Sequence, residues 1–582
     1  MRATSLFIGH HNLSLLRINW SGEVGRALTE GRRGLTGVVL LSAGINILML
    51  SSSIYMMLVY DRVLPSASLP TLFGLFFLVT LLFLFQAGFD ILRAWMLSDV
   101  AGAFEARLAP RVLDIAHRLA IRAPDTARTN SPVRDLDQIR QFVASPGPAA
   151  LIDLPWVILF LGVLTAMHIW LGVATLVAAL ALASLTWMSD KASQKYTGDL
   201  VGLQVQRAQT TERLRRHAEL IQANGMIGAM TDQHRSISAR LGDVQRSFGE
   251  KLASFTGISR VARMFMQSVI LTVGALLVLN GQATAGIIFA SSILSGRALA
   301  PIDQAIGQWR SFGTARDSWN RLDATLEKLP PAPVPMQLPK PNRAITVDRI
   351  AVAPPGGDRL SLADITLQAA NGHVIGVIGP SGSGKSTLLR AIVGVWPLAR
   401  GSVRIDGASI DQFPPDVLGQ TIGYLPQSID LFAGTVAQNI ARFQSDAQPG
   451  AIIHAAKLAG VHDLILSLAV GYDTELGEDG GRLSAGQRQR IGLARALYGD
   501  PFLIVLDEPN SNLDPEGEAA LVAALMAGKK RGAITIVATH RQSVLDAATH
   551  VLFVRDGKAA DFGLRDAVLS KVRRAATPGT AA

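Results

Sequence analysis

The first 330 residues alternate between long uncharged apolar runs and polar segments. Two of the runs suit one membrane-crossing helix each, which needs about 20 residues. The other two are longer than one crossing requires, so each predicts a helical hairpin, with turns near residues 168–170 and 280–282. The pattern therefore predicts six membrane spans. The four runs without a charged side chain are 37–59, 63–89, 154–189 and 264–296.

The pattern changes after residue 330. The stretch LPPAPVPMQLPKP is rich in proline, which favours an extended, semi-rigid linker. Beyond it, HVIGVIG and FLIVLDEP are continuous apolar runs, typical of buried parallel strands. We therefore predict an α-helical six-span transmembrane domain followed by a soluble α/β domain. The expected boundaries are an N-terminal segment at 1–34, the membrane domain at 35–328, the linker at 329–341, the α/β domain at 342–570 and a disordered tail at 571–582.

Composition and charge agree with a membrane protein. Of 582 residues, 49% are hydrophobic and only 17% are charged, below the roughly 25% of soluble proteins. The net charge is +10, and residues 1–330 hold 31 Lys and Arg against 22 Asp and Glu. A basic excess within an apolar half follows the positive-inside rule and argues against nucleic-acid binding. The chain has no cysteine, which excludes disulfides, a thiol nucleophile and a Cys-ligated metal.

Charge also predicts the orientation of the spans. Segments 1–35, 90–148 and 190–263 carry 5, 8 and 12 Lys and Arg, whereas the turns on the opposite side carry only Arg62. The basic segments are therefore expected in the cytoplasm, together with the soluble domain.

The stretch GPSGSGKST has the pattern of a phosphate-binding loop, directly after an apolar strand and before a helix. Its glycines let backbone N–H groups converge on phosphates, Lys385 supplies charge to the β- and γ-phosphates, and the Ser386 hydroxyl binds Mg²⁺. A turn that is merely rich in Gly and Ser rarely carries the lysine and the flanking strand as well. The predicted loop residues are Gly379, Pro380, Ser381, Gly382, Ser383, Gly384, Lys385, Ser386 and Thr387.

Three later stretches add chemistry, and each also has a purely structural explanation. Asp507 suits a Mg²⁺ partner and Glu508 a base that polarises water, or the two are an acidic strand end. In LSAGQ, Ser484 and Gly486 form an anion site at the positive end of a helix, or only an N-cap. His540 follows the strand AITIVAT and reaches a γ-phosphate, or is an ordinary core histidine.

Taken together and in order, these stretches resemble the full motif set of the ATP-binding-cassette ATPases. The resemblance covers the whole soluble domain and implies a P-loop fold that binds ATP with Mg²⁺. Cassettes of that family pair head to tail, so it also implies a homodimer in which LSAGQ of one subunit caps the nucleotide of the other. The motifs are GPSGSGKST, YLPQ, LSAGQRQR, LIVLDEP, SNLD and ATH.

The resemblance implies a role for each matching position. Glu508 is the catalytic base, His540 the γ-phosphate clamp and Gln427 the sensor beside the metal. Mg²⁺ is assigned to Ser386, Gln427 and Asp507. The cap supplied to the partner's nucleotide is assigned to Ser484, Gly486 and Gln487.

The membrane half resembles a narrower group. Residues 56–72, 152–172 and 283–309 look like the permease/ATPases of type I secretion, in particular the branch that exports proteases from Gram-negative bacteria. This resemblance implies an inner-membrane exporter, surrounded by lipid, for an unfolded polypeptide with a C-terminal signal. A periplasmic adaptor and an outer-membrane channel are the implied partners. Polar segments near 120–130 and 221–227 are the implied couplers between the two halves.

Two other functions stay open on the sequence alone. An exporter of lipid or small amphiphiles would use the same cassettes, although the stretch YDRVLPS disfavours it by family likeness. An ATP-gated channel or regulator without steady turnover is the second, and intact Glu508 and His540 argue against it.

The adenine site departs from the family pattern. Most cassettes stack the base on an aromatic side chain upstream of the phosphate loop, but no Phe, Tyr or Trp occurs from 320 to 395. Val352, Pro354 or Pro355 is therefore expected to form the platform, and weak discrimination between ATP and GTP is expected with it.

Overall fold

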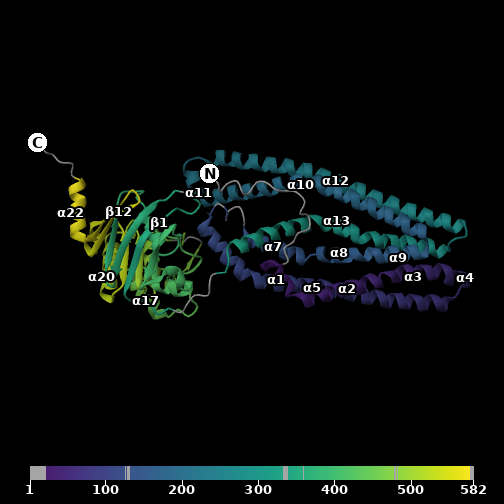
Figure 1. Cartoon of the computed structure of the whole chain (residues 1–582), viewed down its shortest axis with the longest axis horizontal. Coiled ribbons are helices and arrows are strands. Elements are labelled where there is room, and N and C mark those ends of the chain that lie inside the picture. The colour runs from purple at the N-terminus through teal and green to yellow at the C-terminus, as the bar shows by residue number, and fades with distance from the viewer. Residues whose placement is uncertain are drawn as a thin grey trace. The chain divides into compact units, whose positions relative to one another are not determined.

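The computed structural model describes residues 21–124, 126, 131–331, 338–357, 359–477, 480–481 and 483–576. The chain divides into two compact units, one of Met1–His117 and Arg128–Pro330 and the other of Arg118–Ala127 and Pro331–Ala582. Helices build the first unit, and all the described strands lie in the second (Figure 1). The predicted class, a six-span helical domain followed by an α/β domain, is confirmed.

Helices account for nearly all of the described chain before the linker. The elements are α1 (Glu23–Thr29), α2 (Arg32–Leu48), α3 (Leu50–Leu58), the π-helical η1 (Val59–Val63), α4 (Leu64–Ser66), α5 (Leu69–Arg122), α7 (Pro132–Val143), α8 (Gly147–Asp153), the 3-10 turn η2 (Leu154–Trp156), α9 (Val157–Met167), α10 (Ile169–Arg216), α11 (Ala218–Ala223), α12 (Ile227–Leu279) and α13 (Ala285–Lys328).

Six helical stretches are long and apolar enough to cross a membrane, as the uncharged runs predicted. Both hairpins turn where expected, since α9 ends before His168 and α12 ends before Asn280. The six stretches are Arg32–Ser66, Leu69–Arg122, Gly147–Met167, Ile169–Ser189, Ile227–Leu279 and Ala285–Lys328.

The first span is longer than its uncharged run. The sequence placed Arg62 in the turn after the span, but the helix continues through η1 and α4, and the turn comes at Ala67 with φ 48°. The helix accepts the charged side chain of Asp61 because that side chain meets hydrogen-bond donors. Its carboxylate accepts hydrogen bonds from the Thr284 hydroxyl (2.7 Å) and the Gly286 N–H (2.8 Å). Asp61 therefore caps the N-terminus of α13, where main-chain N–H groups need acceptors.

A buried ion pair joins three spans. Arg93 of α5 donates to the Asp153 carboxylate of α8 (2.9 Å) and to the Ser42 hydroxyl of α2 (3.0 Å). Asn46 of α2 also donates to Asp153 (2.9 Å). Removing one member of such a pair strands a buried charge at a cost of about 3–5 kcal/mol. The cluster therefore fixes how α2, α5 and α8 pack.

The second unit combines short strands with helices. Its elements are β1 (Ala344–Val352), β2 (Leu362–Ala370), β3 (Val374–Ile378), α14 (Lys385–Ile392), β4 (Arg400–Ile405), β5 (Ala408–Ser409), η3 (Ile410–Gln412), α15 (Pro415–Thr421), β6 (Ile422–Leu425), β7 (Gly434–Thr435), α16 (Val436–Ile440), α17 (Pro449–Leu458), α18 (His462–Leu466), η4 (Gly471–Asp473), β8 (Glu475–Leu476), α19 (Ala485–Leu497), β9 (Leu503–Asp507), α20 (Pro515–Arg531), β10 (Ile534–Ala538), α21 (Gln542–Ala547), β11 (His550–Arg555), β12 (Lys558–Leu564) and α22 (Arg565–Ala576).

Two main sheets organise this unit. The larger has the order β12-β11-β3-β10-β9-β6, and its strands are parallel except for β12. The smaller has the order β2-β1-β4-β5 and is antiparallel. The runs HVIGVIG and FLIVLDEP form β3 and β9, whose residues are almost all buried, as parallel central strands require. One apolar core joins both sheets with α14, and a second joins the larger sheet with α16 to α20.

The C-terminal end differs from the sequence prediction. The α/β domain was expected to end at residue 570, but α22 continues to Ala576. Residues 332–337 of the predicted linker and 577–582 of the predicted tail lie outside the described part of the chain.

Candidate nucleotide site

The predicted motifs meet at one edge of the larger sheet. Ala538 of β10 lies level with Val377 of β3 and with Asp507 of β9. Parallel strands place their carboxyl ends together, and ligands of open α/β sheets bind at that edge. The motifs that follow β3, β10, β9 and β6 are, in turn, the phosphate loop, His540, Glu508 and Gln427.

The phosphate loop is closed around its own lysine. The buried Lys385 ammonium donates to the main-chain oxygens of Gly379 (2.8 Å) and Pro380 (2.9 Å). Two of the glycines are required by the backbone. A Cβ on Gly379 would lie 2.1 Å from the oxygen of Val554, and Gly384 has φ 101°, a conformation that favours glycine. The loop therefore holds a positive charge at the centre of a turn built for close approach.

The other loop positions differ in exposure. Ser381 and Gly382 are exposed. The hydroxyl of Ser383 is buried and has no hydrogen-bond partner among the described residues. Ser386 and Thr387 follow in the first turn of α14, and both are partly buried.

Asp507 is suited to a cation. It is 1% exposed, and neither carboxylate oxygen has a hydrogen-bond partner in the described part of the chain. Burial raises the pKa of Asp507, and the Glu508 carboxylate adds to this shift. The Ser386 hydroxyl is near enough to oppose the shift, but it does not meet the geometry of a hydrogen bond to either oxygen. Mg²⁺ is usually held by one or two carboxylates plus substrate phosphates and waters. Asp507 with Ser386 therefore fits Mg²⁺, although among the described residues no group of three or more His, Asp or Glu side chains is arranged to hold a metal ion.

Glu508 lies between two side chains that the sequence assigned to the same site. The Gln427 amide donates to one carboxylate oxygen (3.0 Å), and the Nε2 atom of His540 lies 3.4 Å from the other. The Glu508 main chain is left-handed, with φ 48°, and its N–H donates to Ala538 (3.0 Å). Such a conformation is uncommon for a residue with a side chain. Here it accompanies a carboxylate that contacts Gln427 and His540.

Sequence reasoning missed Gln489. This glutamine lies on the buried face of α19, 1% exposed, and its amide donates to the main-chain oxygens of Glu508 (3.3 Å) and Pro509 (2.7 Å). It also accepts from Asn512 (3.0 Å). A polar residue on the apolar face of an amphipathic helix was the available signal. Gln489 ties the helix that begins at LSAGQ to the strand end that carries Glu508.

The start of α19 is capped within the chain. The Ser484 hydroxyl accepts from the N–H of Gln487 (3.2 Å), and the Gln487 side chain accepts from the N–H of Ser484 (2.9 Å). This capping box still leaves the hydroxyl proton of Ser484 free to donate. No hydrogen bond is described for the N–H groups of Ala485 and Gly486. A Cβ on Gly486 would lie 2.8 Å from the oxygen of Asn512, so this turn also needs glycine.

The expectation for the adenine platform was wrong at one position. Val352 is 0% exposed and packs in the core between the two sheets, so a base cannot rest on it. Pro354 and Pro355 are partly exposed and remain predictions. The difference arises because Val352 ends β1 with its side chain on the inner face, which the sequence did not reveal.

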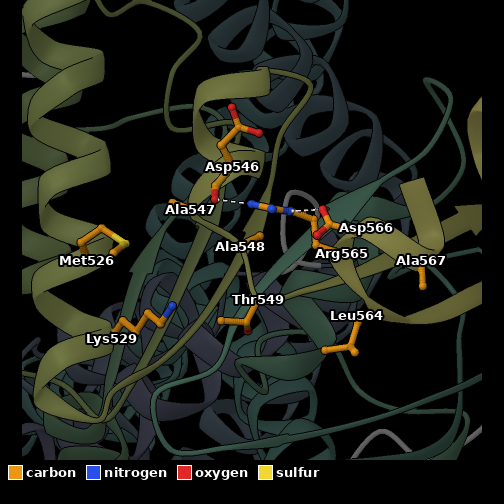
Figure 2. A pocket seen from close by; sticks show the side chains of 10 residues that line it. All are labelled: Met526, Lys529, Asp546, Ala547, Ala548, Thr549, Leu564, Arg565, Asp566 and Ala567. Carbon is orange, nitrogen blue, oxygen red and sulfur yellow. Dashed lines mark hydrogen bonds and ion pairs between the residues drawn. The ribbon is translucent and has the colours of Figure 1, made fainter. Parts of the chain in front are cut away.

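A cavity of about 440 Å³ lies at the opposite edge of the sheet. It is lined by the residues just before β11 and by the ends of α20 and β12 (Figure 2). The Arg565 guanidinium at its wall is already held by the Asp566 carboxylate (2.8 Å) and the main-chain oxygen of Asp546 (2.6 Å). None of the predicted nucleotide residues lines it, so the site is assigned to the other edge.

A phosphate loop, a strand-end Asp–Glu pair and six membrane spans on one chain define an ATP-binding-cassette exporter. Residues 362–511 match the ABC transporter family. The chain is 45% identical to the type I secretion system ATP-binding protein PrsD of Rhizobium meliloti strain 1021, over 95% of each protein. It is 30% identical to the cyclolysin secretion/processing ATP-binding protein CyaB of Bordetella pertussis, over 94% of this chain and 77% of CyaB. The chain belongs to the type I secretion ATP-binding proteins of the ABC transporter family.

A solved structure supports the fold. The chain is similar to a bacterial Atm1-family ABC exporter with ATP bound, with a TM-score of 0.79, 21% identity and coverage of 94% of this chain and 99% of that one. The protein is thus a multi-pass membrane ATPase that couples ATP hydrolysis to transport.

Proposed function

We propose that the protein is the inner-membrane exporter of a type I secretion system and moves an unfolded polypeptide with a C-terminal signal. The proposed cargo is protease-like, and the proposed partners are a second copy of this chain, a periplasmic adaptor and an outer-membrane channel. The relatives support type I secretion. The single observation that best supports ATP hydrolysis is that Gln427 and His540 both contact the Glu508 carboxylate, at the sheet edge where the phosphate loop follows β3.

The proposed hydrolysis step follows from this geometry. Lys385 leaves the oxygens of Gly379 and Pro380 and donates to the nucleotide phosphates instead, since its three N–H groups need acceptors in either state. Glu508 accepts a proton from the attacking water. His540 is 57% exposed at the side chain, so it is free to turn from Glu508 to the γ-phosphate.

Mg²⁺ is proposed to sit beside Ser386 and Asp507. When bound, it neutralises charge that develops on the β- and γ-phosphates. The unpartnered oxygens of buried Asp507 support this assignment. A direct role of Gln427 at the metal is a further part of the proposal, although the described contact of its amide nitrogen is with Glu508.

We also propose that each subunit lends its LSAGQ loop to the other. The hydroxyl proton of Ser484 and the N–H groups of Ala485 and Gly486 lie at the positive end of α19, which favours a phosphate, and no hydrogen bond from them to the described residues is found. In the described chain the Gln487 side chain is used in the capping box. Its contribution would therefore be to hold this turn in shape.

The head-to-tail arrangement has a direct test. In a mixed dimer, Lys385→Ala on one subunit and Ser484→Arg on the other leave one intact composite site, whereas both changes on one subunit damage both sites. Nucleotide trapping should therefore be retained in the first arrangement and lost in the second. Equal trapping in the two arrangements would show that Ser484 does not act in trans.

Cargo class has a separate test. A passenger polypeptide fused to the C-terminal segment of a type I secreted protease should leave cells that supply the adaptor, the channel and this protein. Removing that segment, or introducing Glu508→Gln, should abolish export. Export that continues without the C-terminal segment would contradict the proposed signal.

A further inference from the structure

All three guanidinium nitrogens of Arg442 donate hydrogen bonds to main-chain oxygens. The residue follows α16 in a left-handed conformation, with φ 56°, and its side chain is partly buried. An arginine offers five N–H groups in a fixed plane. Nε donates to Arg495 (3.0 Å), one terminal nitrogen donates to Ile422 (3.3 Å) and Gly419, and the other donates to Ala496 (3.2 Å) and Tyr498 (3.3 Å).

No carboxylate compensates this charge among the described residues. Burial lowers the pKa of Arg442 to about 10, and the neighbouring Arg495 guanidinium contributes in the same direction. A cation in such surroundings is normally paired. Here its compensation comes from carbonyl dipoles, three of which belong to the last turn and C-cap of α19, the negative end of that helix.

Arg442 supplies the C-terminal cap of α19. Among the main-chain donors after the helix, the N–H of Asp500 reaches the oxygen of Leu497 (3.3 Å). The oxygens of Arg495, Ala496 and Tyr498 are met by Arg442 instead. The helix that begins with the Ser484 capping box is therefore held at its other end by a side chain from outside it.

The same guanidinium holds the start of β6. Gly419 lies in α15 and Ile422 is the first residue of β6, the strand that leads to Gln427. The strand and α19 approach closely, since a Cβ on Gly423 would lie 2.0 Å from the oxygen of Ala496.

Further contacts join α19 to the segment that begins with β6, and we call this interface the seam between β6 and α19. A Cβ on Gly492 would lie 3.0 Å from side-chain carbons of Ile429 and Leu425. Arg495 donates to the main-chain oxygen of Asp430 (3.0 Å). The segment that carries Gln427 and the helix that begins at Ser484 therefore share one packed interface, with Arg442 at its end.

We propose that Arg442 is a positioning residue that makes β6 and α19 one rigid body, so that Gln427 and Ser484 move together. Gln427 contacts Glu508 of its own subunit, and Ser484 lies in the loop proposed to serve the partner. The state of one nucleotide site is thereby passed to the loop that completes the other. This inference rests on the proposed roles of Gln427 and Ser484.

The test uses Arg442→Lys and Arg442→Met in the full-length protein. Lysine keeps the charge but concentrates its donors on one nitrogen, so it cannot hold β6 and α19 at once. Both variants should lower kcat of the ATPase at least about tenfold and abolish any cooperativity between sites. The affinity of the phosphate loop for a fluorescent ATP analogue should stay within about twofold, because neither variant touches that loop.

Arg531→Lys is the matched control. Its side chain is one-third exposed, and burial also lowers its pKa. It binds the Asp500 carboxylate and the main-chain oxygen of Pro501 (2.9 Å) in the loop after α19, and no hydrogen bond is described from it to β6 or to α19 itself. This control should lower the thermal midpoint as Arg442→Lys does, while kcat stays near the wild-type value. If Arg442→Lys keeps kcat within twofold of the wild-type value, the proposal is wrong. It is also wrong if Arg442→Lys and Arg531→Lys both lose kcat in proportion to their loss of stability, because Arg442 would then only stabilise the fold.

The mixed dimer of Lys385→Ala and Ser484→Arg tests the trans role of Ser484 separately from the role of Arg442. Equal trapping in both arrangements would remove the trans role of Ser484. A tenfold loss of kcat in Arg442→Lys at unchanged analogue affinity would then still establish Arg442 as a positioning residue, but the passage of information between subunits would be refuted.

Discussion

Asp507→Asn should stabilise the nucleotide-free protein. Asp507 is almost fully buried and its two oxygens lack donors in the described structure, so the ionised carboxylate is held there at a cost. Asparagine keeps the shape and removes the charge, whose burial is more costly than that of an amide. The asparagine amide would be unpaired as well, so only the excess cost of the charge is relieved, and we take it as about 1 kcal/mol, the lower end of the range for an unsatisfied buried group. For a domain of this size, 1 kcal/mol moves the thermal midpoint by about 2–4 °C, so we expect a rise of at least about 2 °C.

The pH dependence has a definite sign. Because the folded pKa of Asp507 is raised, the folded state keeps its proton at a pH where the unfolded state has lost it. Stability of the wild type therefore falls as pH rises between the ordinary pKa of aspartate and the raised one. The advantage of Asp507→Asn should be absent below that window and complete above it. Added Mg²⁺ and ATP should reverse the order, because only the wild type gains a ligand for the cation.

Thermal melting of the full-length protein between pH 4 and pH 8, with and without Mg²⁺ and ATP, provides the measurement. Asp135→Asn is the contrasting control, because buried Asp135 is paired with Arg321 (2.6 Å), and its loss should lower the midpoint. If Asp507→Asn lowers the midpoint of the nucleotide-free protein as Asp135→Asn does, Asp507 is already partnered and the assignment to Mg²⁺ loses its support.

Three further outcomes are expected. Glu508→Gln should keep ATP binding and lower turnover at least about 100-fold, since a positioned base contributes about 10²–10⁴-fold to the rate. Turnover near the wild-type rate in an ATPase assay would show that Glu508 is not the base. Cysteines placed singly at Ser66 and Gln222 of this cysteine-free chain should react with an impermeant thiol reagent from opposite sides of the membrane, Gln222→Cys from the cytoplasm. Labelling in the reverse sense would overturn the orientation. Competition binding should show affinities for ATP and GTP within about tenfold of each other. The reason is that Pro354 and Pro355 recover only part of the roughly 1–3 kcal/mol that stacking on an aromatic side chain contributes. A strong preference for ATP would reveal another contact to the base.

The sequence by itself determined the features that depend on local pattern and residue chemistry. Uncharged runs of sufficient length have to cross a membrane or be buried, so the six spans and both hairpin turns followed from them. The strands β3 and β9 followed from continuous apolar runs. The loop around Lys385 followed from its glycines and lysine, because few other turns combine those residue types at that spacing. Each of these signals lies within one continuous stretch of the chain and needs no knowledge of distant contacts.

Only the tertiary structure decided which distant groups meet and which face of an element is covered. The role of Asp61 depends on Gly286, and the role of Arg93 depends on Asp153. Val352 was one of three alternatives for the base platform although β1 turns it into the core, because a strand's alternation does not say which face meets solvent. Arg442 gave no local signal at all, since its partners are main-chain oxygens, which every residue carries. A backbone carbonyl becomes a partner only when the fold leaves it without an internal donor and brings it within reach.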